Sequence, residues 1–154
     1  MTALHGTALG VALDEEGPLR GVLLVGPPGC GKSQLAAELI AHCPHQRTGL
    51  IADDLVDVDG EGWAETPAAR PLLHLRGMGI AEVREAPPMA MDFIVRLGPT
   101  EQADTADPRL AGAREIPVDA KTVTAAKLRL ALRSLASGHS LWCGFEPGPE
   151  PHGD

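Results

Sequence analysis

Residues 21–33 read Gly-Val-Leu-Leu-Val-Gly-Pro-Pro-Gly-Cys-Gly-Lys-Ser, an apolar run followed at once by a glycine-rich loop that ends in Lys-Ser. This is the spacing of a Walker A loop, whose backbone N–H groups surround phosphate oxygens at the start of a helix. The residues that we assign to nucleotide binding are Gly26, Pro27, Pro28, Gly29, Cys30, Gly31, Lys32 and Ser33. Lys32 is expected to reach the terminal phosphates, and Ser33 to offer its hydroxyl to Mg²⁺. The alternative, a chance glycine-rich turn, leaves the flanking strand and helix patterns unexplained.

Apolar periodicity around the loop indicates a small α/β protein. Leu35, Leu39 and Cys43 recur at helical spacing, which predicts a helix over residues 33–43 that ends before Pro44. Short apolar runs predict strands at residues 3–13, 21–25, 49–52, 55–58 and 91–97. A second helix is expected over about residues 122–137, capped by Gly138, with a buried face made of Leu128, Ala131, Leu132 and Leu135.

Length and composition limit the domain count and the partners. A chain of 154 residues is one domain of ordinary size, and its core must be aliphatic because aromatic residues make up only 3%. Thirteen basic residues against twenty-one acidic ones leave a formal charge of −8. This balance argues against a nucleic acid or an anionic membrane as the main partner. A small ligand or another protein is the expected partner.

Three cysteines, Cys30, Cys43 and Cys143, form no Cys-x-x-Cys pair, so neither a disulfide framework nor a structural zinc site is expected. The first residues lack the charged start and apolar stretch of a signal peptide, which makes the cytoplasm the expected location. We expect a single folded unit over residues 1–145. Residues 146–154 are rich in Gly, Pro and acidic residues and are expected to be a disordered tail.

Asp53-Asp54 follows the next apolar run after the loop helix. Phosphoryl transfer to an alcohol needs a carboxylate at the metal and a carboxylate that takes the hydroxyl proton, and two adjacent acids could supply both. Neighbouring side chains on an extended strand point to opposite faces, so a local turn must bring both into one site, or only one acts there. The alternative is a solvated loop corner.

The ordered motifs together resemble the catalytic domain of bacterial HPr kinase/phosphorylase. The residues that carry this resemblance are His5-Gly6, the loop at residues 26–33, Ala52-Asp53-Asp54, Leu75-Arg76-Gly77-Met78-Gly79-Ile80 and Ile116-Pro117-Val118. The resemblance covers roughly residues 5–137 and implies a phosphoenolpyruvate carboxykinase-like fold, with the phosphate loop on a mixed β-sheet. It also implies the short form, which lacks the N-terminal domain of most members.

By position, the resemblance implies that Asp53 is the base that deprotonates the acceptor serine, with His5 beside it tuning its charge. It places Asp54 at the metal and Arg76 near the active site and a subunit contact. An ordinary strand histidine and a surface arginine are the plainer alternatives for His5 and Arg76.

Three positions depart from the family pattern. His74 stands where the family usually has a metal-holding Glu, and Gln34 stands where Glu usually follows the loop serine. Magnesium prefers oxygen ligands, whereas manganese tolerates a histidine better. The basic loop expected after Val118 is reduced to Lys121, so the phosphate-driven reverse reaction is less secure than the kinase reaction.

The sequence therefore predicts an ATP-dependent protein-serine kinase that uses Mg²⁺ or Mn²⁺ and acts on the phosphocarrier protein HPr of the sugar phosphotransferase system. Homo-oligomers are a further expectation from the family. Two alternatives stay open: a small-molecule P-loop kinase, for which we find no arginine-rich lid, and a weakened or non-catalytic nucleotide sensor, for which His74 and Gln34 are the signs.

Overall fold

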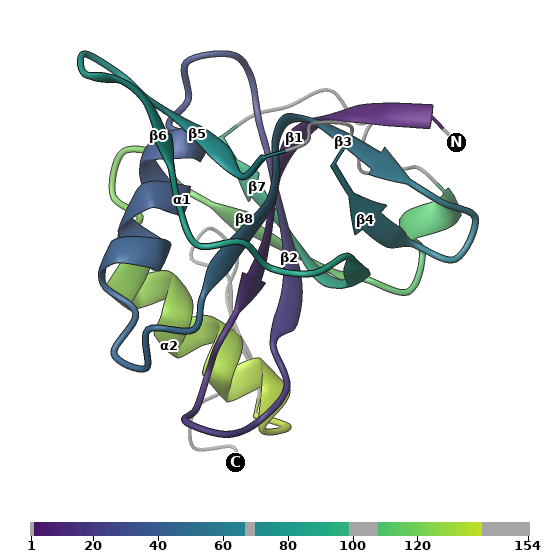
Figure 1. The fold of residues 1–154 in the computed structure, drawn as a ribbon. Helices are drawn as coiled ribbons and strands as arrows, with labels where there is room; N and C mark the ends of the chain where they lie inside the picture. Colours follow the sequence, from purple (N-terminus) through teal and green to yellow (C-terminus); the bar gives the residue numbers. More distant parts are fainter. Residues whose placement is uncertain (1, 67–69, 99–107, 140–154) are drawn as a thin grey trace.

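A computed structural model describes residues 2–66, 70–98 and 108–139, and Figure 1 shows their arrangement. The elements in chain order are β1 (Thr2–Val11), β2 (Arg20–Val25), α1 (Lys32–Ala41), β3 (Gly49–Val58), β4 (Trp63–Glu65), β5 (Leu72–Leu75), β6 (Gly79–Glu82), β7 (Met89–Leu97), a 3₁₀ turn η1 (Pro108–Leu110), β8 (Arg114–Val118) and α2 (Ala125–Ala136). The expected tail at 146–154 lies outside the described residues.

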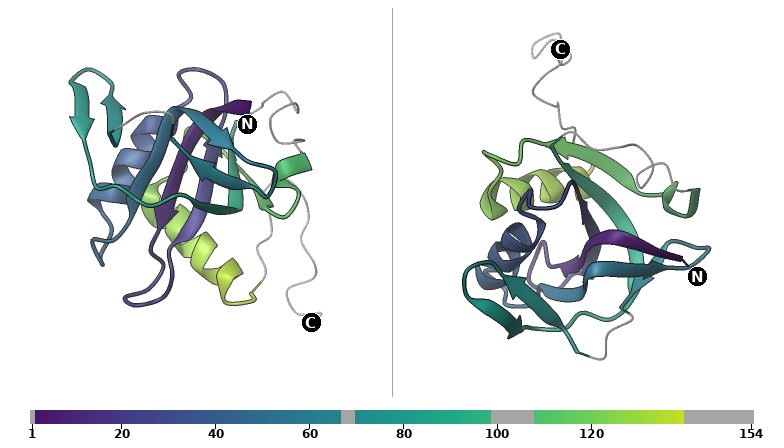
Figure 2. Two further views of the ribbon diagram at one scale, coloured as in Figure 1. Left: turned by 45° about the vertical axis from the view of Figure 1, so that its right-hand side comes forward. Right: turned by 90° about the horizontal axis from the view of Figure 1, so that it is seen from above.

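Six strands form one mixed sheet in the order β2-β1-β3-β4-β7-β8, and β2 also pairs with β7. β1 is antiparallel to β2 and β3, whereas β7 is parallel to β2 and β8. Because β4 joins β3 to the start of β7, the sheet curls round until its strands close a ring, as Figure 2 shows from above. β5 and β6 form a separate hairpin. The expected α/β fold with a mixed sheet is confirmed.

The core has two parts because successive strand residues face opposite sides of the sheet. On one side, Leu9, Val22 and Leu24 join the buried faces of α1 and α2, which lie side by side against the sheet (Figure 2). On the other side, Ala8, Leu23, Val25 and their neighbours fill the inside of the curl. This two-sided burial explains why β2 reads as an unbroken apolar run.

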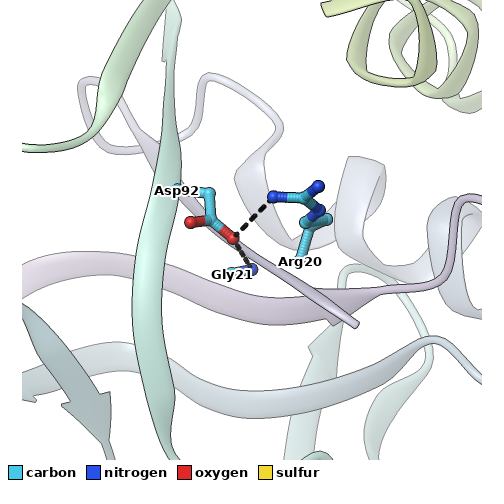
Figure 3. Close-up of polar contacts among 3 residues, drawn as sticks. All are labelled: Arg20, Gly21 and Asp92. Carbon is cyan, nitrogen blue, oxygen red and sulfur yellow. Dashed lines mark hydrogen bonds and ion pairs between the residues drawn. The ribbon is translucent and has the colours of Figure 1, made fainter. Parts of the chain in front are cut away.

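The pairing of β2 with β7 contains an irregularity at Asp92. Gly21 lies opposite Met91 and Val22 lies opposite Phe93, so Asp92 is the extra residue of a bulge. Figure 3 shows its carboxylate accepting a hydrogen bond from the Gly21 N–H at 3.3 Å and lying 3.9 Å from Arg20 Nη1. Both ionic side chains are well exposed, so the ion pair adds little stability. The main effect of the Asp92 contacts is to hold β2 and β7 in this register.

Most predicted elements match the observed ones within a few residues, but the short strands β4, β5, β6 and β8 were not predicted, and β3 and α2 differ from the expectation in extent. β3 runs unbroken from Gly49 to Val58 where two short strands were expected, because β1 pairs with it along its length and the chain bends at Asp54 without leaving the sheet. α2 begins at Ala125 because the Thr124 hydroxyl accepts a hydrogen bond from the Lys127 N–H and caps it. Within α2, Leu128 and Leu132 are buried, whereas Ala131 and Leu135 are half-buried. None of the helices in the described ranges is long and apolar enough to cross a membrane.

Cys43 follows α1 and is buried. Burial opposes ionisation of its thiol, but hydrogen bonds from the Thr48 hydroxyl and from the backbone N–H groups of Arg47, Thr48 and His45 outweigh it, and the pKa of Cys43 falls to about 6. The Arg129 guanidinium also lies close, with Nη2 at 3.6 Å from Sγ. Cys43 therefore joins the end of α1 to α2 through Arg129.

Candidate nucleotide-binding and phosphoryl-transfer site

The glycine-rich loop joins the end of β2, a strand between β1 and β7, to the start of α1. Gly29 and Gly31 have φ angles of 78° and 104°, a left-handed region that side-chain-bearing residues rarely adopt. Gly31 is the N-cap of α1, and no side chain caps this helix end. The N–H groups of the first turn are thus free to bind an anion, and the helix dipole favours negative charge there.

Lys32 lies over the loop that it follows. Its ammonium group donates to the carbonyl oxygens of Gly26 at 2.8 Å and Pro27 at 3.3 Å. Cys30 packs beneath it: its Sγ occupies the space beside Gly26, 2.6 Å from the point where a Cβ on that glycine would lie. A phosphate in the loop would compete with these carbonyls for the ammonium group, which is the role expected of a Walker A lysine.

Asp53 is the most connected side chain of the site. Its Oδ1 accepts hydrogen bonds from Thr7 Oγ1 at 2.9 Å and from Ser33 Oγ at 3.1 Å. Its Oδ2 accepts from the His74 backbone N–H at 3.2 Å and lies 3.3 Å from Ser33 Oγ. Hydrogen bonds to an ionised carboxylate are among the stronger ones in proteins. Three separate elements therefore hold this carboxylate beside the loop serine.

Thr7 is a site residue that the sequence did not reveal. The register of β1 on β3 places Thr7 directly opposite Asp53, and the Thr7 side chain is 1% exposed. It lies on the same face of β1 as Leu9 and Val11, the face that packs toward α1. Only the pairing of the two strands gives this information, because a buried threonine in an apolar strand carries no signal of its own.

Asp54 lines the same cavity as Asp53 although the two are neighbours on one strand. Its φ of 74° is unusual for a residue other than glycine, and Asp and Asn are the residues that tolerate it best. The local turn that the sequence analysis required is therefore present as a kink within β3. Asp54 is exposed and Asp53 half-buried, so the two carboxylates occupy different environments.

One cavity of about 700 Å³ collects the loop, the two aspartates and the β5–β6 hairpin. Its lining consists of Thr7, Pro28, Gly29, Gly31, Lys32, Ser33, Gln34, Asp53, Asp54, His74, Leu75 and Arg76. The volume is within the range of small-molecule and cofactor sites.

The β5–β6 hairpin brings two of the expected residues to this cavity. Arg76 reaches over the loop, since its Nη1 lies 4.0 Å from the point where a Cβ on Gly29 would be. His74 lines the cavity and bonds Asp53 through its backbone N–H, a contact that does not depend on the side chain at this position. Gln34 also lines the cavity, and its side chain donates to Glu38 one turn later at 3.1 Å.

His5 and Lys121, like Gly26, Pro27 and Cys30 of the loop, are not among the residues that line the cavity. His5 is exposed, and its cross-strand neighbour is Leu55, so Thr7 occupies the place beside Asp53 that was expected for His5. Lys121 is exposed in the turn after β8, where its N–H donates to Asp119 Oδ1 at 2.9 Å. β8 is parallel to β7, which is parallel to β2. The turn after β8 and the phosphate loop after β2 therefore lie at the same edge of the sheet.

The oxygen atoms at the site suit a magnesium ion that is carried by a nucleotide. Within residues 2–66, 70–98 and 108–139, no group of three or more His, Cys, Asp or Glu side chains could hold a metal by itself. Magnesium in phosphoryl-transfer sites is usually bound by one or two protein oxygens together with phosphate oxygens. Ser33 Oγ beside the Asp53 carboxylate, with Asp54 lining the same cavity, provides such a set, whereas the imidazole of His74 is a softer ligand.

Comparisons with known proteins agree with this architecture. A family model described as the HPr Serine kinase C-terminal domain matches residues 2–105, which include the loop, both aspartates and the hairpin. Among solved structures, the Hpr(Ser) kinase/phosphatase from Coxiella burnetii is similar, with a TM-score of 0.63 and 19% identity over 90% of each chain. No curated protein matches the chain. At this identity the structural likeness supports the fold, and the family match spans well over half of the sequence. From the loop, the paired aspartates and this match, we conclude that the chain belongs to the family of the HPr serine kinase C-terminal domain.

Proposed function

We propose that this chain is an ATP-dependent protein-serine kinase that phosphorylates a serine of an HPr-type phosphocarrier protein. The observation that carries the proposal is the contact of Ser33 Oγ with the two oxygens of the Asp53 carboxylate, at 3.1 and 3.3 Å. This contact lies at the N-terminus of α1, which no side chain caps. It brings a phosphate cradle, a metal-binding hydroxyl and a carboxylate within reach of one reacting phosphoryl group.

The nucleotide phosphates are proposed to bind the N–H groups of the loop and of the first turn of α1. Lys32 then exchanges the carbonyls of Gly26 and Pro27 for the β- and γ-phosphates. Arg76, which lies over Gly29, adds positive charge from the turn of the β5–β6 hairpin. A bound magnesium or manganese ion would neutralise the phosphates, held by Ser33 and Asp54 with His74 nearby.

Asp53 is the proposed general base. It accepts the proton of the acceptor serine hydroxyl as the serine oxygen bonds to the γ-phosphorus and the β–γ bridging oxygen leaves with ADP. The hydrogen bond from Thr7 and the N–H of His74 fix its orientation, so little reorganisation is needed when the acceptor arrives. We propose no role for His5 in this step, because Thr7 takes the position beside Asp53.

A protein acceptor is favoured over a small molecule by the surface next to the cavity. The β5–β6 hairpin that carries Arg76 exposes Met78 by 85% and Ile80 by 70%. Exposed apolar side chains grouped beside a reaction site indicate a surface that contacts another protein. A small-molecule substrate would bind inside the cavity and would not contact Met78 and Ile80 on the exposed hairpin.

The test is a transfer assay with purified HPr, ATP and either Mg²⁺ or Mn²⁺, with phosphoserine on HPr detected by mass spectrometry. Lys32→Ala should remove nucleotide binding, whereas Lys127→Ala, which changes an exposed side chain of α2, should leave it unchanged. Asp53→Asn should keep nucleotide binding but remove transfer. If HPr carries no phosphoserine with either metal, the proposal is wrong; if Asp53→Asn keeps the full rate, the base is another residue.

Nucleotide binding without efficient transfer is the second candidate, because His74 and Gln34 replace carboxylates expected beside the metal. His74→Glu discriminates the two. The backbone N–H to Asp53 is kept by either side chain, so only the metal ligand changes. A large gain in Mg²⁺-dependent transfer identifies a weakened kinase, and no gain with intact ATP binding identifies a sensor.

The same samples, incubated with phosphorylated HPr and inorganic phosphate, test the reverse reaction that Lys121 is proposed to assist.

A further inference from the structure

A second cavity of about 570 Å³ lies between α1 and α2, away from the phosphate loop. Leu13, Leu39, Pro44 and Leu130 give it apolar walls, and Arg129 and Arg133 line it from α2. Leu130 is 67% exposed, which is unusual for a leucine on a helix whose opposite face is buried. We call this cavity the interhelical groove.

Basic and imidazole side chains outnumber acidic ones in the lining of the interhelical groove, although Asp14, Glu15 and Glu16 line a neighbouring cavity that shares Arg133 with it. Arg129 and Arg133 line the groove, as do His42 and His45, and the one carboxylate in the lining, Glu38, already accepts a hydrogen bond from Gln34. Arg129 Nη2 donates to the carbonyl of Ala12, but its Nη1 is buried and has no hydrogen-bond partner among the described residues. Arg133 is exposed in the same lining, so the groove favours an occupant that brings acidic or carbonyl oxygens to a guanidinium group.

The sequence that follows α2 has the matching chemistry. Residues 140–154 read Ser-Leu-Trp-Cys-Gly-Phe-Glu-Pro-Gly-Pro-Glu-Pro-His-Gly-Asp. Three large apolar side chains, Leu141, Trp142 and Phe145, come first, and three acidic residues follow without a single Lys or Arg. We propose that this segment docks in cis in the interhelical groove, with its apolar residues against the leucines and its carboxylates toward Arg129 and Arg133.

The helix end permits this return. Gly138 has a φ of 87°, and the His139 N–H donates to the Ser134 carbonyl at 2.9 Å, a Schellman-type cap that ends the helix and so allows the chain to leave its axis. Going back along α2 from Ala136 to Arg129 covers about 10 Å at 1.5 Å per residue. About three to four extended residues span that distance. Trp142 and Phe145 therefore have enough chain to reach the groove.

Attachment to α2 also favours this occupant over a separate partner. A tethered segment binds as an intramolecular ligand at an effective concentration near the millimolar range, so a weak contact suffices to fill the groove. Opposite charges add to it and make the docking sensitive to salt. The inference is independent of the kinase proposal, because neither the groove nor the segment contains a residue of the phosphate site.

The experiment uses Trp142 as the reporter in the Trp63→Phe chain, which leaves one of the two tryptophans. Its emission should be blue-shifted and quenched several-fold less by acrylamide than that of a free peptide of residues 140–154. Arg133→Glu should shift the emission toward that of the free peptide, and high salt should do so in part. Arg114→Glu, the same change at another exposed arginine, on β8 and outside the groove lining, is the matched control and should have no effect. Circular dichroism verifies that both variants are folded.

Three results would overturn the proposal. The first is free-peptide emission from Trp142 in the unsubstituted background. The second is an equal response to Arg133→Glu and Arg114→Glu. The third is a blue shift that disappears on dilution, which would assign the segment to the groove of a second copy. A chain that ends at His139 provides the converse test: the peptide of residues 140–154, added at millimolar concentration to match the effective concentration of the tether, should bind it with the same blue shift. The absence of binding at that concentration would also refute the docking.

Discussion

Thr7→Val tests whether the cross-strand contact beneath the loop positions the proposed base. Valine has nearly the shape of threonine, and Thr7 is 1% exposed, so the change removes one hydroxyl without opening a cavity. The hydroxyl donates to Asp53 Oδ1 at 2.9 Å. Its loss leaves the carboxylate with the donors Ser33 and His74 N–H, and Ser33 is the donor that a bound metal would take away.

The structure sets the size of the effect. A hydrogen bond to a charged group contributes roughly 1.5–3 kcal/mol. If the bond acts only by holding Asp53 in its reactive orientation, transfer should fall by roughly ten- to over a hundredfold, since about 1.4 kcal/mol is a factor of ten. ATP affinity measured without metal should stay the same, because the loop and Lys32 are untouched.

Thr48→Val is the control for this prediction. Thr48 is also fully buried, but its hydroxyl accepts a hydrogen bond from the Ala12 N–H at 3.1 Å, outside the phosphate site. Both variants should lose stability in urea unfolding by about 1–3 kcal/mol, and only Thr7→Val should lose transfer in the HPr assay. Equal transfer rates in the two variants would refute the positioning role of Thr7.

Three further predictions concern the loop, the core and the thiol. Gly31→Ala should abolish ATP binding in a calorimetric titration, because φ is 104° at this position and alanine is strained there. Leu132→Ala should lower the free energy of unfolding by about 2–5 kcal/mol, whereas Leu130→Ala, 67% exposed on the same helix, should change it little. Because the folded pKa of Cys43 is lowered from 9.0 to about 6, its contribution to stability is present at high pH and lost as pH falls through about 6. Under reducing conditions, Cys43→Ala should therefore flatten the rise in unfolding free energy between those pH values.

Each of these three predictions has a result that would contradict it. Retained ATP affinity in Gly31→Ala would show that the loop does not need its left-handed turn. Equal losses of unfolding free energy in Leu132→Ala and Leu130→Ala would mean that α2 does not bury Leu132 in preference to Leu130. An unchanged pH profile in Cys43→Ala would mean that the thiol ionises with a similar pKa in the folded and unfolded chains.

The sequence by itself determined the local parts of this protein. The strand-loop-helix unit around residues 21–41 could be predicted because its information is contiguous: apolar period, glycine positions and the Lys-Ser pair all lie within one segment. The same is true of the Asp53-Asp54 pair and of α2, whose buried leucines recur at helical spacing. The ordered motifs also indicated the family, which the family match confirms.

The tertiary structure decided which residues meet. Thr7 and Asp53 are 46 positions apart, and only the register of β1 on β3 places Thr7, and not His5, beside the carboxylate. Arg76 lies over Gly29 because a separate hairpin returns to the loop, and His74 contributes a backbone N–H that no side-chain pattern encodes. Such contacts depend on strand pairing between distant segments, and shifting that pairing by one residue would turn every side chain to the other face. For this reason the loop could be predicted from sequence, whereas the groups that hold the carboxylate of Asp53, the proposed base, could not.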